Sequence, residues 1–193
     1  MQLWVGLGNP GAQYALHRHN VGFMAADIVA EVHGFSPWSK KFRSLLAEGR
    51  VGRHRVLLLK PQTFMNDSGD AVQQAMRFYK LEMKDLTVFH DELDLAPFKV
   101  KVKIGGGTAG HNGLRSIDAA LGPDFRRVRI GIGHPGQGRK DLVTPHVLGN
   151  YAKREMESLS DLLAAIAGEA DWLADGDDPR FMSEVALRLQ QSD

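Results

Sequence analysis

Short apolar runs that stop abruptly at small or polar residues are the feature that most constrains the fold of this chain. Residues 3–7 end at Gly8, and residues 86–90 end at Asp91. An apolar run of about five residues bounded by turn residues is typical of a buried strand, whereas a helix needs a longer apolar periodicity. The pattern therefore predicts buried strands whose ends carry glycine and polar side chains.

Segments with helical spacing alternate with these strands. The apolar residues between 21 and 32 share one helical face, and Gly34 follows as a stop signal. Similar patterns predict strands at residues 3–7, 44–51, 54–59, 86–90, 98–104 and 127–132, and helices at 21–32, 68–79, 112–121, 155–173 and from 178 onward. This order favours an α/β fold in a single domain over residues 1–193, with a mixed twisted β-sheet and helices on both faces.

Composition excludes several classes of protein. The 43% apolar content is enough for a core, and the absence of cysteine rules out disulfides and thiol chemistry. No apolar run reaches the roughly 18 residues of a membrane span. The N-terminus lacks the pattern of a signal peptide, so we expect a cytoplasmic protein.

Charge is distributed unevenly along the chain. The first 150 residues carry 20 Lys and Arg against 13 Asp and Glu, whereas the last 43 carry 4 against 10. Either each charge is solvated on its own surface, or the first part presents a basic face to a polyanion while the acidic segment packs elsewhere.

The first predicted strand leads into Gly6-x-Gly8-x-x-Gly11, which resembles a dinucleotide-binding fingerprint. Pro10 lies inside the turn, and the next helix begins too late to direct its amides at a pyrophosphate. No acidic residue ends a clear second strand about 20 residues later. A tight turn that requires glycine, or a loop that projects Asn9 into a site, is favoured, and a dinucleotide-dependent oxidoreductase stays an alternative.

His19 and Asp91 are the candidates for acid–base chemistry, although a lone histidine at a helix start is also a common surface residue. Ligands of open α/β sheets bind beyond the carboxyl ends of the strands. If the strands that end near Gly8 and Asp91 are parallel neighbours, the two side chains meet. An aspartate that accepts the imidazole Nδ1–H leaves Nε2 as a general base. Since no convincing serine or cysteine nucleophile is present, that base would act on water, and an activated ester would suit it.

Three asparagines stand in the polar motifs: Asn9, Asn66 and Asn112. Asn66 and Asn112 each open a predicted helix, where an N-cap needs no further function. Alternatively, their amides donate to a carbonyl oxygen, at a helix N-terminus that favours a developing oxyanion. Metal binding is disfavoured because the histidines have neither His-x-x-x-His nor His-Glu-x-x-His spacing.

A basic stripe follows two alternating strands and the glycine-rich loop at residues 105–110. Its members are Lys99, Lys101, Lys103, Arg115, Arg127 and Arg129. Cations beside glycine amides suit phosphate, although a solvated face explains the same pattern. The loop lacks the Gly-Lys-Ser/Thr ending of a P-loop, which disfavours nucleoside triphosphate hydrolysis.

Taken in order, these motifs resemble those of bacterial-type peptidyl-tRNA hydrolases. The resemblance rests on residues 3–20, 60–69, 90–95, 103–116 and 129–135, whereas the C-terminal segment matches only as helices. It implies a monomer without metal or cofactor that hydrolyses the ester between a peptide and the 3′ ribose of tRNA. It also implies contacts with the 3′ CCA end and the acceptor-stem phosphates. A noncatalytic RNA-binding relative is the other alternative.

The resemblance implies a role for each motif residue. His19 corresponds to the catalytic histidine of the family and Asp91 to its aspartate partner. The site asparagines would be Asn9, Asn66 and Asn112. The cleft for the tRNA end and the peptide would be lined by Tyr14 and Met65. The tRNA phosphates would be held by Lys101, Lys103 and Arg129.

Overall fold

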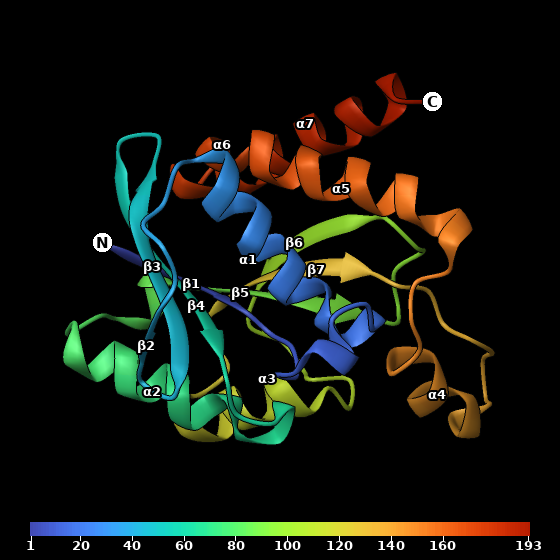
Figure 1. The fold of residues 1–193 in the computed structure, drawn as a ribbon, viewed down its shortest axis with the longest axis horizontal. Helices are drawn as coiled ribbons and strands as arrows, with labels where there is room; N and C mark the ends of the chain where they lie inside the picture. Colours follow the sequence, from blue (N-terminus) through green and yellow to red (C-terminus); the bar gives the residue numbers. More distant parts are fainter.

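The computed structural model describes all of residues 1–193 and contains one seven-stranded sheet (Figure 1). The strands lie in the order β2-β3-β4-β1-β5-β7-β6. Their bounds are β1 Gln2–Gly6, β2 Ser39–Lys41, β3 Ser44–Val51, β4 His54–Pro61, β5 Leu86–Glu92, β6 Val100–Ile104 and β7 Arg126–Gly131. The predicted hairpin is confirmed as β3 and β4, whereas β2 was not predicted.

The central strands are parallel, and antiparallel strands close both edges. Val5 of β1 pairs with Leu59 of β4 on one side and with Val88 of β5 on the other. Strand β7 continues the parallel arrangement, while β3 and β6 run antiparallel to their neighbours. The sheet is therefore mixed, as predicted. Because carboxyl ends of parallel strands share one edge, β1 and β5 deliver the residues that follow them to the same place.

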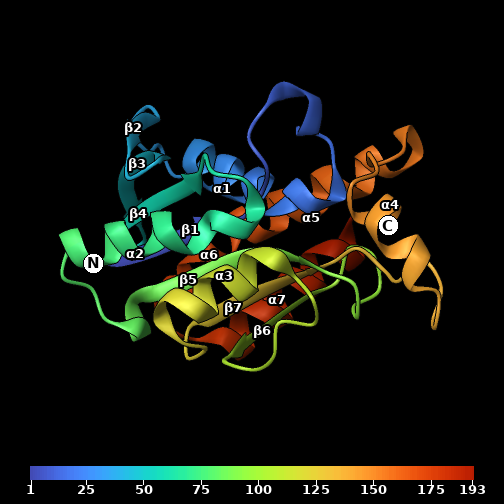
Figure 2. The ribbon, with the colours of Figure 1, turned by 90° about the horizontal axis from the view of Figure 1, so that it is seen from below.

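Helices cover both faces of the sheet, as predicted (Figures 1 and 2). Val21, Ala25 and Val29 recur at helical spacing and are fully buried in a hydrophobic core cluster on one face of the sheet. That cluster lies beneath α1 Val21–Val32, α5 Met156–Gly168, α6 Ala170–Ala174 and α7 Asp178–Gln191. The opposite face carries α2 Ser68–Phe78 and α3 Asn112–Leu121. None of these helices has both the length and the apolar character needed to cross a membrane.

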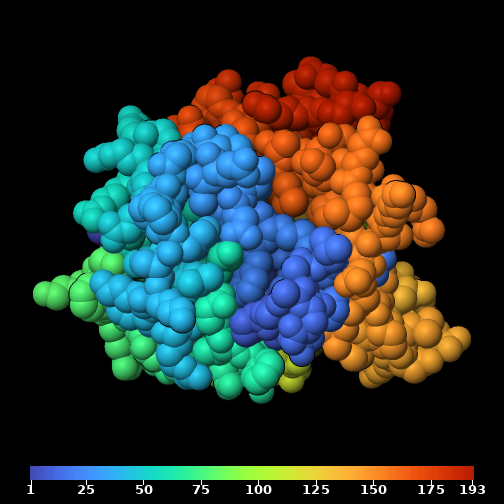
Figure 3. Space-filling model, in the orientation of Figure 1, coloured from blue at the N-terminus to red at the C-terminus, as the bar shows by residue number.

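The short helix α4 (Val143–Val147), which was not predicted, stands away from both helical layers (Figures 1 and 2). The chain after it returns along the segment that precedes α1. There the N–H of Tyr151 donates to the Leu16 carbonyl, and the N–H of Arg18 donates to the Gly149 carbonyl, each at 3.0 Å. In the space-filling view this orange segment lies against the blue N-terminal segment (Figure 3).

Two predicted boundaries are wrong, each for a local reason. The helix predicted at residues 155–173 is two helices, because Glu169 leaves the helical conformation (φ −103°, ψ 8°) between α5 and α6. Its carboxylate accepts hydrogen bonds from Trp172 and from Arg188 of α7. The strand predicted from residue 98 begins at Val100, because Phe98 has a φ of 65°, outside the extended region.

Gly22 allows α1 to approach the sheet closely. A Cβ on Gly22 would lie 2.4 Å from the Phe89 carbonyl oxygen and 2.6 Å from backbone atoms of Leu7. Gly6 faces it, since a Cβ there would lie 2.2 Å from the Gly22 carbonyl oxygen. This contact places the start of α1, and the turn just before it, against the ends of β1 and β5.

We expect Gly22→Ala to lower the free energy of unfolding by about 1–3 kcal/mol, because the added methyl group has no space against backbone atoms. Urea unfolding followed by circular dichroism measures the change. Gly107→Ala is the control, since its added Cβ would meet no atom within 4 Å. Equal losses in the two variants would contradict the close-packing explanation.

Candidate active site

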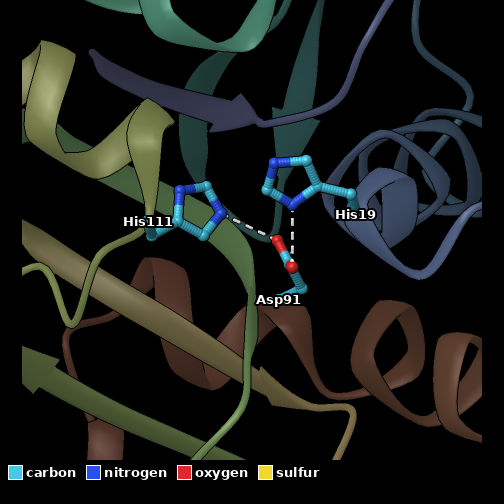
Figure 4. Close-up of side chains that lie close together, drawn as sticks. All are labelled: His19, Asp91 and His111. Atoms are coloured by element: carbon cyan, nitrogen blue, oxygen red, sulfur yellow. Dashed lines mark hydrogen bonds and ion pairs between the residues drawn. The ribbon is translucent and has the colours of Figure 1, made fainter. Parts of the chain in front are cut away.

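His19 and Asp91 meet at the edge of the sheet where β1 and β5 end. Asp91 lies at the end of β5, and His19 lies in the 3-10 turn η2 (Arg18–Asn20) that leads into α1. A hydrogen bond of 2.8 Å joins His19 Nδ1 to Asp91 Oδ2 (Figure 4). The exposed fractions of the two side chains are 10% and 3%. The proximity expected from the two parallel strands is therefore present.

His111 is a third member of this cluster, and sequence reasoning gave it no role. Its Nε2 lies 2.7 Å from Asp91 Oδ1, so each carboxylate oxygen of Asp91 faces one imidazole (Figure 4). The His111 and His19 rings lie 4.8 Å apart. The available signal was a histidine directly before a predicted helix, in Gly110-His111-Asn112-Gly113.

The hydrogen bonds of His111 indicate which of its nitrogens carries the proton. The backbone N–H groups of Gly113 and Leu114 donate to Nδ1 at 3.1 and 3.3 Å. Because Nδ1 accepts, the proton of the neutral ring belongs on Nε2, which donates it to Asp91. One ring therefore caps α3 and fixes the carboxylate at the same time.

Burial and charge act in opposite directions on the ionisable groups of the cluster. Burial opposes ionisation of Asp91, but the two imidazoles outweigh it and hold the pKa of the carboxyl below its ordinary value. Burial likewise opposes a charge on His19, yet Asp91 raises the pKa of that imidazole. His90 donates from Nδ1 to the Asp91 carbonyl at 2.8 Å. Burial, with His111 nearby, lowers the pKa of His90 to about 3, so this ring is neutral near pH 7.

The remaining nitrogen of His19, Nε2, is available for chemistry. With Nδ1–H donated to Asp91, the neutral imidazole presents the lone pair of Nε2. His19 lines a cavity of about 490 Å³ together with Asn9, Met65, Asn66 and Asn112. The structure thus brings together the predicted histidine, all three asparagines and one of the two predicted cleft residues.

Asn9 is fixed by three hydrogen bonds that leave its amide NH₂ without a protein partner. Its Oδ1 accepts from the Met65 backbone N–H at 2.9 Å. The Asn20 side chain bonds both the N–H and the carbonyl of Asn9, each at 2.9 Å. Asn20, which follows His19 directly, is a further residue that sequence reasoning left without a role.

Asn66 and Asn112 are not helix caps, which corrects one of the two interpretations left open by the sequence. The N-cap position of α2 is Asp67, and that of α3 is His111. Asn66 lies in the 3-10 turn η3 (Met65–Asp67), and Asn112 is the first residue of α3. Both residues are exposed and line the cavity. Their amide groups are therefore accessible to a ligand, at helix starts that favour negative charge.

The two predicted cleft residues occupy different places. Met65 is buried at 4% exposure and lines the cavity beside His19. Tyr14 lies in the turn η1 (Ala12–Tyr14), with its ring edge-on to His17 at 5.3 Å, and it does not line that cavity. Phe64 lines the cavity with 65% of its surface exposed, although no sequence signal distinguished it from a core residue.

The predicted phosphate-binding cations lie on β6 and β7, on the side of β5 that faces away from β1. Lys101 of β6 is in register with Arg129 of β7. Arg129 donates from Nε to Glu92 at 2.8 Å, so part of its charge is already neutralised. Lys103 extends over the glycine loop, since a Cβ on Gly106 would lie 2.8 Å from its Nζ.

Arg127 does not belong to the basic stripe, which corrects the prediction from alternation. Its side chain is completely buried. It donates to the Gly107 carbonyl at 2.7 Å and to the Pro123 carbonyl at 3.2 Å, and it lies over the Phe125 ring. Arg127 therefore anchors the glycine loop from beneath, because a guanidinium carries enough donors to hold several carbonyls.

Donor atoms of His19, Asp91 and His111 lie within 4.8 Å of one another, close enough to raise the question of a metal ion. Metal ligation requires an unprotonated imidazole nitrogen. In this cluster His19 Nδ1 and His111 Nε2 carry the protons donated to Asp91. A proton moved to His111 Nδ1 would displace the backbone donors of α3. The cluster therefore suits proton transfer better than metal coordination.

The glycines of the first motif are explained by packing rather than by a pyrophosphate. Gly6 lies against the backbone of Gly22, and a Cβ on Gly8 would lie 2.6 Å from the Phe23 ring. Helix α1 begins only at Val21, well beyond the motif. This geometry favours the tight-turn interpretation over dinucleotide binding.

Comparison with known proteins agrees with this arrangement. The family model described as peptidyl-tRNA hydrolase matches residues 3–192. The peptidyl-tRNA hydrolase of Rhizorhabdus wittichii is 71% identical over 189 residues, covering 98% of this chain and 99% of the relative. That of Erythrobacter litoralis is 67% identical over 190 residues, covering 98% and 100%.

A crystal structure of the peptidyl-tRNA hydrolase from Acinetobacter baumannii has the same fold. It is 38% identical, with a TM-score of 0.88 over 96% of this chain and 94% of that one. The sequence and structural matches both extend over nearly the full chain. The chain therefore belongs to the peptidyl-tRNA hydrolase family of bacterial hydrolases.

Proposed function

We propose that this chain hydrolyses the ester bond between a peptide and the 3′ ribose of tRNA, with water as the nucleophile and His19 as the general base. The observation that carries the proposal is the free Nε2 of His19, at a cavity lined by three asparagines, with Nδ1 bonded to Asp91. Asp91 maintains the required tautomer and stabilises the imidazolium that forms. His111 keeps the carboxylate in place through its second oxygen.

Two proton transfers complete the reaction. The water gives a proton to His19 Nε2 as its oxygen attacks the ester carbonyl, forming a tetrahedral intermediate. The intermediate expels the ribose oxygen, which takes the proton from the imidazolium. Asn66 or Asn112 donates to the carbonyl oxygen as it becomes negative, and one such donor commonly contributes about 3–4 kcal/mol. Asn9, with its NH₂ group free, positions the last ribose or the first peptide unit.

The tRNA and the peptide approach along surfaces of different chemistry. Lys101, Lys103 and Arg129 attract the tRNA phosphates beside the glycine loop. Met65 lines the cavity that would receive the tRNA end and the peptide, whereas Tyr14 lies outside this cavity and would contact the substrate only beyond it. A monomer would be sufficient for this activity, because the site as proposed needs no residue of a second chain, and translation would supply the substrate in the cytoplasm.

We expect His19→Ala to lower kcat by about 10²–10⁴, the usual contribution of a general base. Asp91→Ala should lower kcat less, because Nε2 remains but the ring is poorly oriented. Single-turnover release of tRNA from an N-blocked aminoacyl-tRNA measures both, with circular dichroism to establish folding.

His54→Ala is the matched control, since His54 forms an exposed pair with Asp175 at 2.7 Å away from the cavity. Its rate should equal that of the unmodified protein. Near-normal hydrolysis by folded His19→Ala would refute the mechanism. A folded unmodified protein without turnover would instead support the noncatalytic RNA-binding alternative.

The pH dependence of hydrolysis should follow the charge of His19. Only the neutral ring accepts a proton, so kcat/KM falls as the pH falls through the pKa of His19, which Asp91 raises. Asp91→Asn removes the negative charge, which lowers that pKa and moves the acid limb to lower pH. Maximal activity should also fall, because an amide NH₂ facing Nδ1 favours the wrong tautomer.

The pH–rate profiles of the two proteins measure this effect. The other imidazole rings nearby are those of His17, His90 and His111, of which His90 is neutral throughout this range. Burial and the neighbouring His19 lower the pKa of His17. An acid limb that stays in place in Asp91→Asn, or moves to higher pH, would contradict the assignment of that limb to His19.

We expect Lys103→Ala to weaken tRNA binding and to reduce the salt-dependence slope by about one, as the loss of one phosphate contact predicts. Arg129→Ala should act in the same direction. Hydrolysis of a minimal ester that lacks the acceptor stem should be unchanged. Filter binding at several salt concentrations measures the slope.

Lys84→Ala is the control, because Lys84 is 77% exposed and pairs only with neighbouring Glu82. It should leave the slope unaltered. If Lys103→Ala impairs the minimal ester as strongly as the full substrate, the phosphate assignment is wrong.

A further inference from the structure

Arg18 is the member of the Arg18-His19-Asn20 turn that the proposed mechanism does not use. His19 supplies the base, and Asn20 holds Asn9. The Arg18 side chain bonds to α4 and to the chain after it, and is only 16% exposed. A largely buried guanidinium requires several partners, so its contacts indicate what it holds.

The Arg18 guanidinium contacts three residues of α4 and of the chain that follows it, between residues 146 and 155. Nη1 donates to the His146 carbonyl at 3.3 Å, and Nη2 donates to Glu155 Oε1 at 3.0 Å. Its Cζ lies 5.5 Å from the centre of the Tyr151 ring. Glu155 Oε1 also accepts from the Ala152 N–H at 2.9 Å, so the carboxylate bonds Arg18 and the returning chain together.

The segment held in this way forms one wall of the catalytic cavity. Thr144, Val147 and Leu148 line the same cavity as His19. Helix α4 stands away from the body of the protein (Figures 1 and 2). Apart from Arg18, the side-chain hydrogen bond between the α4 helix and the body is that of His146 Nε2 with the Ile132 carbonyl, at 3.0 Å.

Arg18 is poorly placed to bind the substrate itself. Glu155, whose side chain is 20% exposed, neutralises the charge of Arg18. The guanidinium therefore has little attraction for a phosphate. Its backbone N–H is also committed, to the Gly149 carbonyl. Each hydrogen bond of Arg18 is thus made to a group of the protein itself, and none of them needs a ligand.

We infer that Arg18 is a positioning residue that sets substrate affinity by holding the α4 wall against the turn that carries His19. The inference rests on the proposed function, because affinity is read with peptidyl-tRNA. Loss of the guanidinium removes its two side-chain hydrogen bonds from the wall, which is then held by the backbone bonds to residues 16–18 and by His146, while the bond between His19 and Asp91 stays intact. The defect therefore falls on KM rather than on kcat.

Arg18→Ala should raise KM about tenfold, the value of one charge-assisted hydrogen bond, and change kcat less than about threefold. In the free protein, amide hydrogens of residues 143–150 should exchange about tenfold faster, while those of α1 and β5 stay unchanged. Glu155→Ala should give the same pattern, and the effect of the double variant should be smaller than the sum of the two single effects, because the bond between Arg18 and Glu155 is lost only once. Arg18→Lys, which retains the charge but cannot span both acceptors, should lie in between.

Arg126→Ala is the matched control. Arg126 pairs with Asp178 at 2.9 Å with side-chain exposures of 14% and 21%, close to those of Arg18 and Glu155, but at the opposite end of the sheet. It should lower stability while leaving KM and the exchange at α4 unchanged. If it raises KM as Arg18→Ala does, general destabilisation explains the effect and the inference fails.

Two results separate this inference from the proposed function. Absence of turnover by the unmodified protein would overturn the function, and the exchange measurement would still decide whether Arg18 anchors α4. Unchanged exchange at residues 143–150 in Arg18→Ala, or a loss confined to kcat, would overturn the inference.

Discussion

The candidate site depends on one buried carboxylate that receives an imidazole on each oxygen. Asp91 is the point where three parts of the chain meet: the end of β5, the turn before α1, and the start of α3. A buried carboxylate is stable only when it is paired and hydrogen-bonded. The two imidazoles meet that requirement, and in doing so they acquire the orientation that the proposed chemistry needs.

The three side chains of the turn Arg18-His19-Asn20 make contacts with three different parts of the protein. Asn20 holds the Asn9 loop, His19 faces the cavity, and Arg18 bonds the segment after α4. Gly22, just beyond the turn, allows it to lie against the ends of β1 and β5. A site built on such a turn is as rigid as the packing of α1, which explains how loop residues hold a defined geometry.

Much of the architecture was accessible from local patterns. Strand-length apolar runs predicted β1 and β5, and the position of Asp91 after such a run correctly suggested a meeting with His19. The failures in assigning side-chain roles involve residues whose partners are remote in sequence. Arg127 follows an alternating pattern typical of an exposed row, yet it is buried beneath the glycine loop. His111 is an ordinary residue before a helix until β5 places Asp91 within reach.

The sequence by itself determined six of the seven strands, most of the helices, the mixed α/β class and the residue types available for chemistry, because these follow from periodicity and local conformational preference. Only the tertiary structure decided which polar groups pair. The hydrogen bond from His111 to Asp91 and the contacts of Arg18 with His146 and Glu155 arise between segments that are distant along the chain. Burial makes each unpaired polar group costly, so the packing of remote elements, rather than local pattern, selects the partner.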